Sequence, residues 1–301
     1  MKKVFVNVKL SSLDFLGFRF GGAGLGNILF PWARGIIFAK KHSCKKINCT
    51  WTTIKFGTFL RKEKDKRTYH NIFKENEIKG LMKIFLLAFS NGVNEDDFKF
   101  SIENKRNTVV HFFGMKSQMK DILEDYTIVK EELYKIVRKK HLELAEKNRP
   151  KAIAVHIRLG DFQDPENEDI IRQGKTNCRL PIKWYVAIIN NIRLEVGENV
   201  HVSVFSDGSN DQLKEILQLS NVSRVKNGTA ISDMLSLSYA KVLIASNSTF
   251  SLWSSFIGRI PTIWFPGTNR IKLFFQNEDI FEGELDYFDE VPLSVINPLK
   301  R

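Results

Sequence analysis

The segment His156-Ile157-Arg158-Leu159-Gly160-Asp161 combines residue types that can handle a phosphate-bearing substrate. It follows an apolar run, so we expect it at the end of a strand, with His156 and Arg158 on the same side. Gly160 permits the sharp turn that returns Asp161 toward them. Because a guanidinium binds two phosphate oxygens at once, the segment predicts an imidazole, a cation and a carboxylate converging on a phosphate. The alternative is an Arg158–Asp161 ion pair that only fixes a turn.

Three further segments, at residues 21–27, 205–208 and 245–250, also lie where an apolar run meets polar residues. Ligands of an open parallel sheet bind beyond the carboxyl ends of its strands, so these segments are candidate sites. Ser248 precedes a predicted helix whose N-terminal N–H groups can bind an anion, although a simple helix cap is the alternative. Asp207 can accept hydrogen bonds from a ribose or a guanine edge, or it can cap the next helix.

The glycine-rich segment at residues 21–27 matches neither of the common nucleotide-binding loops. Gly21 and Gly26 have the spacing of a P-loop, but Asn27-Ile28 stands where Lys-Ser or Lys-Thr is required. The dinucleotide fingerprint fails as well, because Asn27 takes the place of its third glycine. The glycines still allow a substrate to approach the backbone closely, and Asn27 offers both a donor and an acceptor.

The second half of the chain alternates short apolar runs with helix-like segments, which predicts a parallel sheet flanked by helices. The expected strands cover residues 152–157, 200–205, 222–225, 242–245 and 262–265. The expected helices cover residues 182–194, 211–219, 231–239 and 250–257. These elements would place three of the four candidate segments at one edge of the sheet.

The first half of the chain is less regular. We expect strands at residues 4–8 and 109–113, a helix that begins near Pro31 and a long helical stretch over residues 118–146. Pro150 and the polar residues before it indicate a linker, so we place a domain boundary between residues 148 and 149. The expected domains are therefore residues 1–148 and 149–301.

Residues 79–87 form an apolar patch beside lysines, which suits either a helix at a membrane interface or a core helix. The net charge of +12 also favours anionic partners such as nucleotides, nucleic acid or acidic membranes, or it marks only a solvated basic face. The basic residues are spread along the chain without an aromatic-basic recognition pattern, so no nucleic-acid partner is expected. Peripheral membrane contact stays open, and the sequence does not indicate an oligomeric state.

The three cysteines, Cys44, Cys49 and Cys178, lack the neighbours of a metal site, and their odd number fits a reducing compartment. No signal peptide and no run of about 18 apolar residues is visible. We therefore expect a cytoplasmic protein, with peripheral contact at the inner membrane as the alternative.

Taken together and in this order, the segments resemble the α1,2-fucosyltransferases of glycosyltransferase family 11, and more distantly the α1,6- and protein O-fucosyltransferases. Residues 22–27 are similar to the family's Gly-Gly-Leu-Gly-Asn loop with one inserted residue, and residues 155–162 resemble its His-x-Arg-x-Gly-Asp motif. Asp233 and residues 246–253 are similar to its C-terminal motif. The sequence departs from the pattern at Leu159, where a second basic residue is usual, and after Asp207, where Gly208 replaces a second acid.

The resemblance implies an α/β fold of the GT-B type, with two Rossmann-like domains that face a cleft. The C-terminal domain would bind GDP-fucose, and the acceptor would enter from the N-terminal side. The implied reaction is an inverting α1,2 transfer of L-fucose to a hydroxyl, on galactose, of a bacterial O-antigen, lipopolysaccharide or other surface polysaccharide. No metal or other cofactor is implied, and the absence of an Asp-x-Asp pair from the sequence agrees with this. A glycosyltransferase for another sugar nucleotide is the alternative.

The matching positions also imply roles for single residues. Arg158 would hold the β-phosphate and stabilise the departing GDP, while His156 and Asp207 would address the guanosine. Ser248, Thr249 and the backbone of Phe250 would hold phosphate oxygens. The remaining donor-binding positions are Gly24, Gly26, Asp233 and Asn247.

The general base that accepts the proton of the acceptor hydroxyl is not fixed by the sequence. Asp161 is the first choice, although its proximity to Arg158 also suits a structural partner. The alternatives are Glu166, Glu168 and Asp169, which follow the motif. Asn27 would orient the acceptor.

Overall fold

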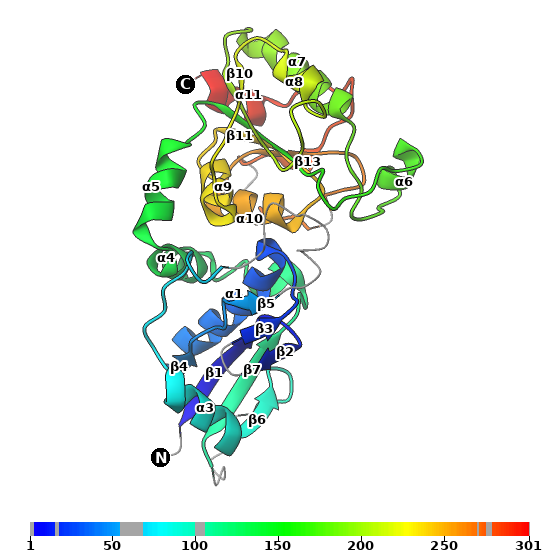
Figure 1. Cartoon of the computed structure of the whole chain (residues 1–301). Coiled ribbons are helices and arrows are strands. Elements are labelled where there is room, and N and C mark those ends of the chain that lie inside the picture. The colour runs from blue at the N-terminus through cyan, green and yellow to red at the C-terminus, as the bar shows by residue number, and fades with distance from the viewer. Residues whose placement is uncertain are drawn as a thin grey trace. The chain divides into compact units, whose positions relative to one another are not determined.

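The chain forms two compact units, Met1–Lys139 and Lys140–Arg301, in a computed structural model that describes residues 3–15, 18–54, 69–99, 106–269, 271–274 and 279–300 (Figure 1). Each unit has a parallel sheet with helices, as the residue pattern predicts for the second half and the family resemblance implies for both. The division falls after the first residue of α5 (Lys139–Lys147), whereas the sequence places the boundary after residue 148. The helix α5 belongs with the C-terminal unit because the carbonyl of Ala145 accepts a hydrogen bond of 3.0 Å from the hydroxyl of Ser236.

The N-terminal unit is built on a parallel sheet with the order β4-β1-β7-β6. Its strands are β1 (Val4–Lys9), β4 (Lys45–Ile47), β6 (Asn91–Asn94) and β7 (Thr108–Phe113). A smaller sheet joins β2 (Leu13–Phe15), β3 (Phe18–Phe20) and β5 (Thr53–Ile54). The predicted strands at residues 4–8 and 109–113 are thus confirmed as β1 and β7.

The helix α1 (Leu25–Lys41) packs against β1, and Gly35 lets the two backbones come close. A Cβ at position 35 would lie only 2.6 Å from Cγ2 of Val8. The prediction that this helix begins near Pro31 is wrong, because the helix starts six residues earlier and Pro31 lies inside it. Burial of Leu29, Phe30 and Trp32 in the core outweighs the hydrogen bond that the proline cannot donate.

The predicted helical stretch at residues 118–146 is also not continuous. It consists of the 3-10 helix η1 (Gln118–Asp121), α4 (Tyr126–Ile136) and α5. Between α4 and α5 the backbone of Val137 pairs with that of Phe73, and Arg138 N donates to the carbonyl of Ile72. These bonds to a distant segment take the place of helical ones.

The helix α3 (Gly80–Phe89) covers the other face of the N-terminal sheet. Its one buried residue, Leu86, packs with Phe5, Ile47 and Val109. Because most of its apolar side chains are exposed, α3 is a surface helix. Of the two interpretations of residues 79–87, the core helix is therefore wrong. No helix in the described ranges is both long enough and apolar enough to cross a membrane.

The C-terminal unit has a parallel sheet with the order β10-β9-β8-β11-β12-β13. Its strands are β8 (Ile153–Ile157), β9 (Val202–Ser206), β10 (Val222–Arg224), β11 (Val242–Ile244), β12 (Thr262–Trp264) and β13 (Glu282–Glu284). The five predicted strands are confirmed, and β13 is an addition. All five residues of β8 are buried.

Helices flank this sheet, as predicted. They are α6 (Glu168–Arg172), α7 (Ile182–Val196), α8 (Lys214–Leu217), α9 (Ala230–Leu237), α10 (Thr249–Gly258) and α11 (Leu293–Lys300). The chain runs from β8 to β9 on one side and later returns to β11 on the other side of β8. The carboxyl end of β8 is therefore the topological switch point, where ligands of such sheets bind.

Candidate active site

Arg158 directly follows β8, and its guanidinium lies between two carboxylates. Nη1 donates to Asp207 Oδ2 and Nη2 donates to Asp161 Oδ1, each at 2.5 Å. The ring of Phe162 lies 5.7 Å from the guanidinium carbon. We call Arg158, Asp161 and Asp207 the Arg158 cluster. It is only partly buried, with 30 % of the Arg158 side chain exposed, so the cation is held in place but can still reach a ligand.

Gly160 makes the close packing of this cluster possible. A Cβ on Gly160 would come within 2.5 Å of Asp207 Oδ2, so any other residue would push the carboxylate aside. Asp207 also accepts a hydrogen bond of 2.8 Å from the backbone N–H of Leu159. Asp207 thus connects the ends of β8 and β9.

The two departures from the family pattern, Leu159 and Gly208, meet in the structure. Leu159 is buried, and its Cδ1 would lie 2.4 Å from a Cβ on Gly208. A larger residue at position 208 requires Leu159 to move. Leu159 packed against Gly208 therefore takes the place of the basic and acidic residues that the family pattern has at these two positions.

His156 is buried inside the sheet edge and is held by two serines. Its Nδ1 lies 2.7 Å from the Ser251 hydroxyl and 2.8 Å from that of Ser246, and its ring packs on Phe250 with centroids 4.9 Å apart. Burial lowers the pKa of His156 to about 3, the Asp207 carboxylate acts against this shift, and the Arg158 cation acts with it. The imidazole is therefore neutral at physiological pH and joins β8 to the start of α10.

The N-terminus of α10 carries the remaining predicted phosphate ligands. Ser248 is the N-cap, with its hydroxyl accepting a hydrogen bond of 3.3 Å from Ser251 N. The amide of Asn247 donates to the carbonyl of Lys175 at 3.1 Å. Thr249 and Phe250 form the first turn, where N–H groups point out of the helix and favour an anion.

Asp233 lies in the first turn of α9, beyond the edge strand β10. Its Oδ1 is buried and has no hydrogen-bond partner among the described residues. Burial raises the pKa of Asp233 to about 7. Only a glycine fits at position 228, because a Cβ there would lie 1.6 Å from Oδ1. A buried acid without donors is costly, so this carboxyl group is a candidate contact for a ligand that supplies N–H groups.

The alternative acids differ in their surroundings. Glu168 accepts one hydrogen bond of 2.9 Å from the hydroxyl of Tyr287 and pairs with Lys183 at 2.9 Å. Glu166 and Asp169 are exposed. Among the four candidate bases, Asp161 is the one that pairs with Arg158 in the described structure.

The remaining predicted residues lie in the N-terminal unit, at the start of α1. Gly24 is the N-cap, while Gly26 and Asn27 belong to the first turn of the helix. Gly21 and Gly22 before it have φ values of +70° and +118°, a conformation that glycine tolerates. These residues form a second helix N-terminus that follows a strand.

Arg179 is a supporting residue that the sequence analysis missed. Its Nε donates to the carbonyl of Leu159 at 2.7 Å, and its Nη1 pairs with Asp164. It thereby fixes the loop that carries the Arg158 cluster. No local pattern around residue 179 indicates this role, because the contact spans twenty positions.

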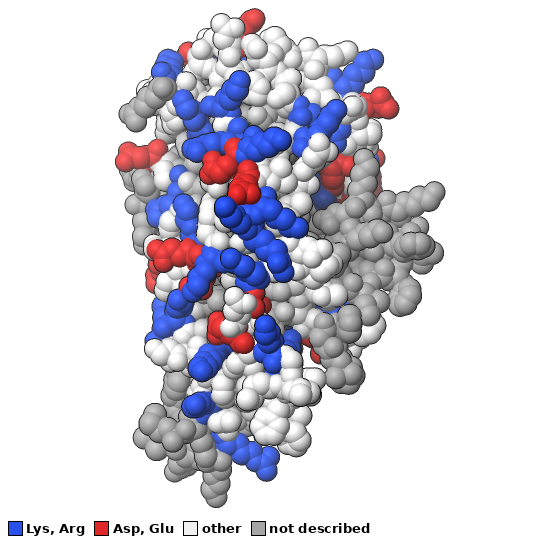
Figure 2. All heavy atoms as spheres, turned by 60° about the vertical axis from the view of Figure 1, so that its left-hand side comes forward, with Lys and Arg blue, Asp and Glu red and all other residues white. Residues whose placement is uncertain are grey.

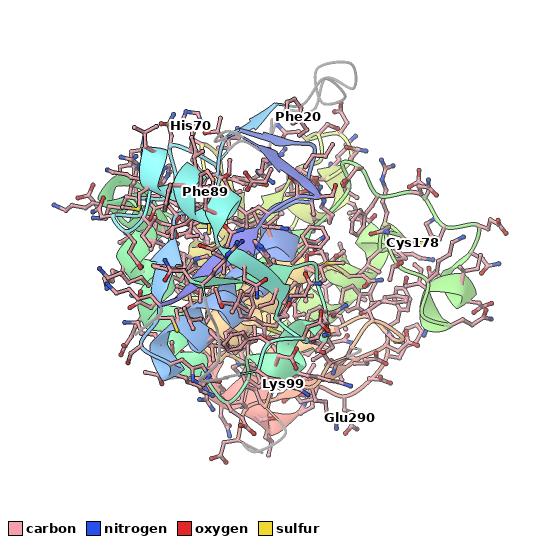
Figure 3. The ribbon with its side chains drawn as sticks, turned by 90° about the horizontal axis from the view of Figure 1, so that it is seen from below. Phe20, His70, Phe89, Lys99, Cys178 and Glu290 are labelled. Atoms are coloured by element: carbon pink, nitrogen blue, oxygen red, sulfur yellow. The ribbon has the colours of Figure 1, made fainter. Side chains whose placement is uncertain are left out.

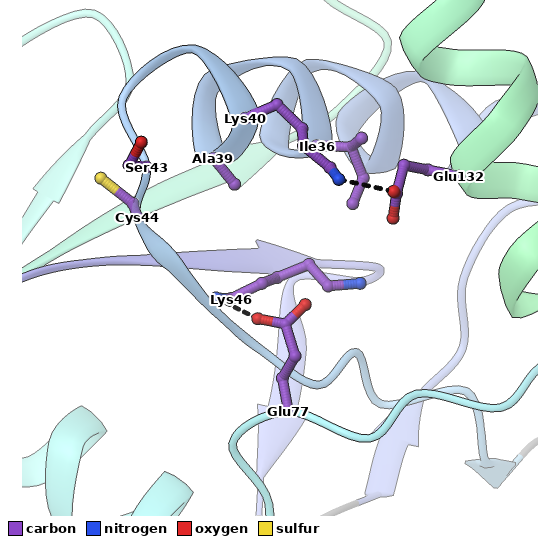
Figure 4. Close-up of a pocket in the computed structure, with 8 residues that line it drawn as sticks. All are labelled: Ile36, Ala39, Lys40, Ser43, Cys44, Lys46, Glu77 and Glu132. Carbon is purple, nitrogen blue, oxygen red and sulfur yellow. Dashed lines mark hydrogen bonds and ion pairs between the residues drawn. The ribbon is translucent and has the colours of Figure 1, made fainter.

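A separate cavity of about 300 Å³ lies in the N-terminal unit and contains none of the predicted residues (Figure 4). It is bordered by an ion pair of 2.7 Å between Lys40 and Glu132, and by Glu77, which accepts from Lys46 N. No group of three or more potential metal ligands occurs among the described residues.

The two parallel-sheet units and the cation at the switch point are the features of a glycosyltransferase of the GT-B type. The chain belongs to glycosyl transferase family 11, whose model matches residues 53–288, well over half of the sequence. The suspected family and the glycosyltransferase activity are thereby confirmed. No curated protein matches the chain.

Solved structures of similar fold include fucosyltransferase NodZ from Bradyrhizobium, with a TM-score of 0.51 and 14 % identity over 89 % of this chain and 97 % of that one. A NodZ alpha-1,6-fucosyltransferase co-crystallized with GDP has a TM-score of 0.50 and the same identity over 88 % of this chain and 96 % of that one. POFUT1 in complex with GDP has a TM-score of 0.47 and 12 % identity over 87 % of this chain and 98 % of that one. The first two matches support the predicted GT-B class of fold.

Proposed function

We propose that this protein is a fucosyltransferase that takes GDP-fucose as donor and inverts the anomeric centre. The observation that carries the proposal is the partly exposed Arg158, held by two carboxylates at the switch point of the C-terminal sheet. Membership of family 11, the order of the four segments, and a similar fold in an alpha-1,6-fucosyltransferase crystallised with GDP support it.

Arg158 stabilises the leaving group in this proposal. Its contacts with Asp161 and Asp207 engage one N–H on each terminal nitrogen, out of the five that a guanidinium carries. The others can bind the β-phosphate oxygens on which negative charge develops as the bond to fucose breaks. The N–H groups of Thr249 and Phe250 at the start of α10 bind further phosphate oxygens, with Ser248 and Asn247 fixing that turn.

Asp233 selects the base of the nucleotide. The guanine edge carries N1–H and N2–H donors side by side, and a carboxylate accepts both. The unsatisfied Oδ1 of Asp233 lacks such donors in this structure. Gly228, which lies against this oxygen, is exposed together with residues 226 and 227, so we expect this short segment to move when the nucleotide binds. His156 and Asp207 have indirect roles in this proposal. His156 holds the start of α10 through Ser246 and Ser251, and Asp207 holds Arg158.

Asp161 is the general base that we propose for the acceptor hydroxyl. It is 40 % exposed and next to the cation that binds the leaving group, so it lies where the sugar must react. Glu168 is already held by Tyr287 and Lys183, which suits a structural role. Asp161→Asn should therefore abolish transfer, and Glu168→Gln should retain most of it, in single-turnover assays with GDP-fucose.

The finer assignments follow from the family resemblance. We propose an α1,2 linkage to galactose in a bacterial O-antigen, lipopolysaccharide or other surface glycan, made in the cytoplasm without a metal. Residues 1–148, with Gly24, Gly26 and Asn27, would serve the acceptor, and residues 149–301 would bind the donor.

A donor screen tests the function. Purified protein is incubated with GDP-fucose, GDP-mannose, UDP-galactose and UDP-glucose, and release of the nucleoside diphosphate is followed. We expect GDP-fucose to be consumed fastest. Preferential consumption of another donor would favour the alternative, a glycosyltransferase for a different sugar nucleotide.

A further inference from the structure

The surface helix α3 exposes an unusual amount of apolar surface. Leu81 is 85 % exposed, Phe89 (labelled in Figure 3) 67 % and Phe85 55 %, and the rings of Phe85 and Phe89 lie 5.0 Å apart. Met82, Ile84 and Leu87 are exposed as well. Clusters of large exposed apolar residues on a soluble protein mark a surface that binds something.

The arrangement of these side chains around the helix indicates what kind of partner fits. At 100° per residue, the exposed apolar positions from Leu87 through Leu81 to Met82 span about 220° of the helix circumference. The remaining arc holds the buried Leu86 and Lys83, whose ammonium group donates to Asn48 O and Thr50 Oγ1. A helix that docks in a protein groove needs a stripe only about 100° wide. An arc this wide suits a fluid apolar medium that surrounds the helix on several sides.

The charged residues of α3 and its N-cap are lysines, and the nearest acid before it in the chain is Glu77, whose carboxylate accepts a hydrogen bond from Lys46 N. Residues 78–94 contain two lysines and no acid. Lys79, the N-cap, is exposed, and so is Lys45. Lys45 lies on the α3 side of the sheet because it is two residues before Ile47, which packs under the helix. The chain carries a net charge of +12, and Lys and Arg cover much of the face shown in Figure 2.

We propose that α3 is a membrane-docking helix that inserts its apolar arc into the surface of an anionic lipid bilayer. Lys45 and Lys79 would contact lipid phosphates at the rim, and the sheet behind α3 takes the place of the polar face that such helices usually have. With ten residues the helix is too short to cross a bilayer, so the contact is peripheral.

Vesicle flotation of the full-length protein, without nucleotide or acceptor, tests this proposal independently of the enzyme activity. The vesicles contain phosphatidylcholine alone or phosphatidylcholine mixed with phosphatidylglycerol. We expect the protein to float mainly with the anionic vesicles. Replacing Phe85 and Phe89 together by serine should weaken binding at least about tenfold, because both rings leave the bilayer. Lys79→Gln should weaken it about fivefold.

Phe288→Ser is the matched control, because Phe288 is 98 % exposed in the other unit and its replacement should leave flotation unchanged. Thermal unfolding checks that all variants fold. Failure of the parent protein to float, or unchanged flotation of the double variant, would overturn the proposal. It would equally be overturned if the parent were a dimer in sedimentation velocity and the double variant a monomer, because α3 would then be a protein interface.

Discussion

The Arg158 cluster and the Asp233 carboxyl group lie at the same carboxyl edge of one sheet, yet their surroundings are opposite. Asp207 and Asp161 are both paired with Arg158, and Asp207 also binds the backbone of Leu159. Asp233, in contrast, has a buried oxygen without a partner in the described structure and a pKa raised to about 7 by burial. In the first region protein groups bond one another, whereas in the second a carboxyl oxygen lacks the donors that a ligand could supply.

This difference suits two separate tasks. A group that stabilises charge in a transition state works best when its position is fixed in advance, because no reorganisation is then needed during the reaction. A group that reads the identity of a base gains selectivity when the wrong ligand leaves it unpaired. We therefore propose that Arg158 serves the chemical step and that Asp233 serves nucleotide discrimination.

The largest effect is expected for Arg158→Ala. Loss of the guanidinium removes stabilisation of the leaving diphosphate, so kcat should fall about 100- to 1,000-fold. Turnover of GDP-fucose with saturating acceptor measures it. Arg149→Ala is the matched control, because that arginine is an exposed residue of the same unit. Wild-type turnover in the Arg158 variant would remove the basis for the proposed mechanism.

A somewhat smaller loss should follow from Gly160→Ala. The new methyl group would collide with Asp207, so the carboxylate must move and Arg158 would lose its alignment. We expect kcat to fall about tenfold or more, with a smaller change in KM, since a small displacement of a catalytic group has large effects. Equal kcat values for variant and parent would show that Asp207 does not position Arg158.

Asp233→Asn should mainly affect nucleotide affinity. An amide cannot accept both guanine donors, so GDP binding should weaken about tenfold or more, whereas the binding of UDP, which lacks this pair of donors, should hardly change. Isothermal titration calorimetry measures both nucleotides. The control is Asp211→Asn, an exposed acid of the same unit. Equal losses for GDP and UDP would mean that Asp233 does not recognise the base.

The smallest effect concerns the pH dependence of stability. The pKa of Asp233 rises from 3.8 to about 7 on folding, so the folded protein binds the proton more tightly than the unfolded chain. The contribution of Asp233 to the free energy of unfolding should therefore be highest below pH 3.8 and fall as the pH rises toward about 7. Comparing Tm of parent and Asp233→Asn across this range isolates the contribution. A parent-minus-variant difference that stays constant with pH would contradict it.

The sequence predicts the C-terminal unit better than the N-terminal one. Buried strands such as β8 are short apolar runs between turn residues, so their positions can be read locally, and the strand-end position of Arg158 follows. The start of α1 cannot be read in this way, because burial of Leu29, Phe30 and Trp32 keeps Pro31 inside the helix. The exposure of α3 cannot be predicted from the sequence either, because an apolar run has the same pattern on the surface as in the core.

Within the site, residue types were predictable but partners were not. The Ser246 and Ser251 hydroxyls that hold His156 come from residues 90 and 95 positions away. The unsatisfied carboxyl group of Asp233 depends on how closely Gly228 approaches it. Such relations arise from the packing of distant segments, so they become visible only in three dimensions.

The structure of the protein bound to GDP tests the central claim most directly. We predict that the β-phosphate lies against Arg158 and the N-terminus of α10, and that the guanine edge donates to Asp233. A nucleotide bound elsewhere, or one whose phosphate lies away from Arg158, would contradict the proposed mechanism.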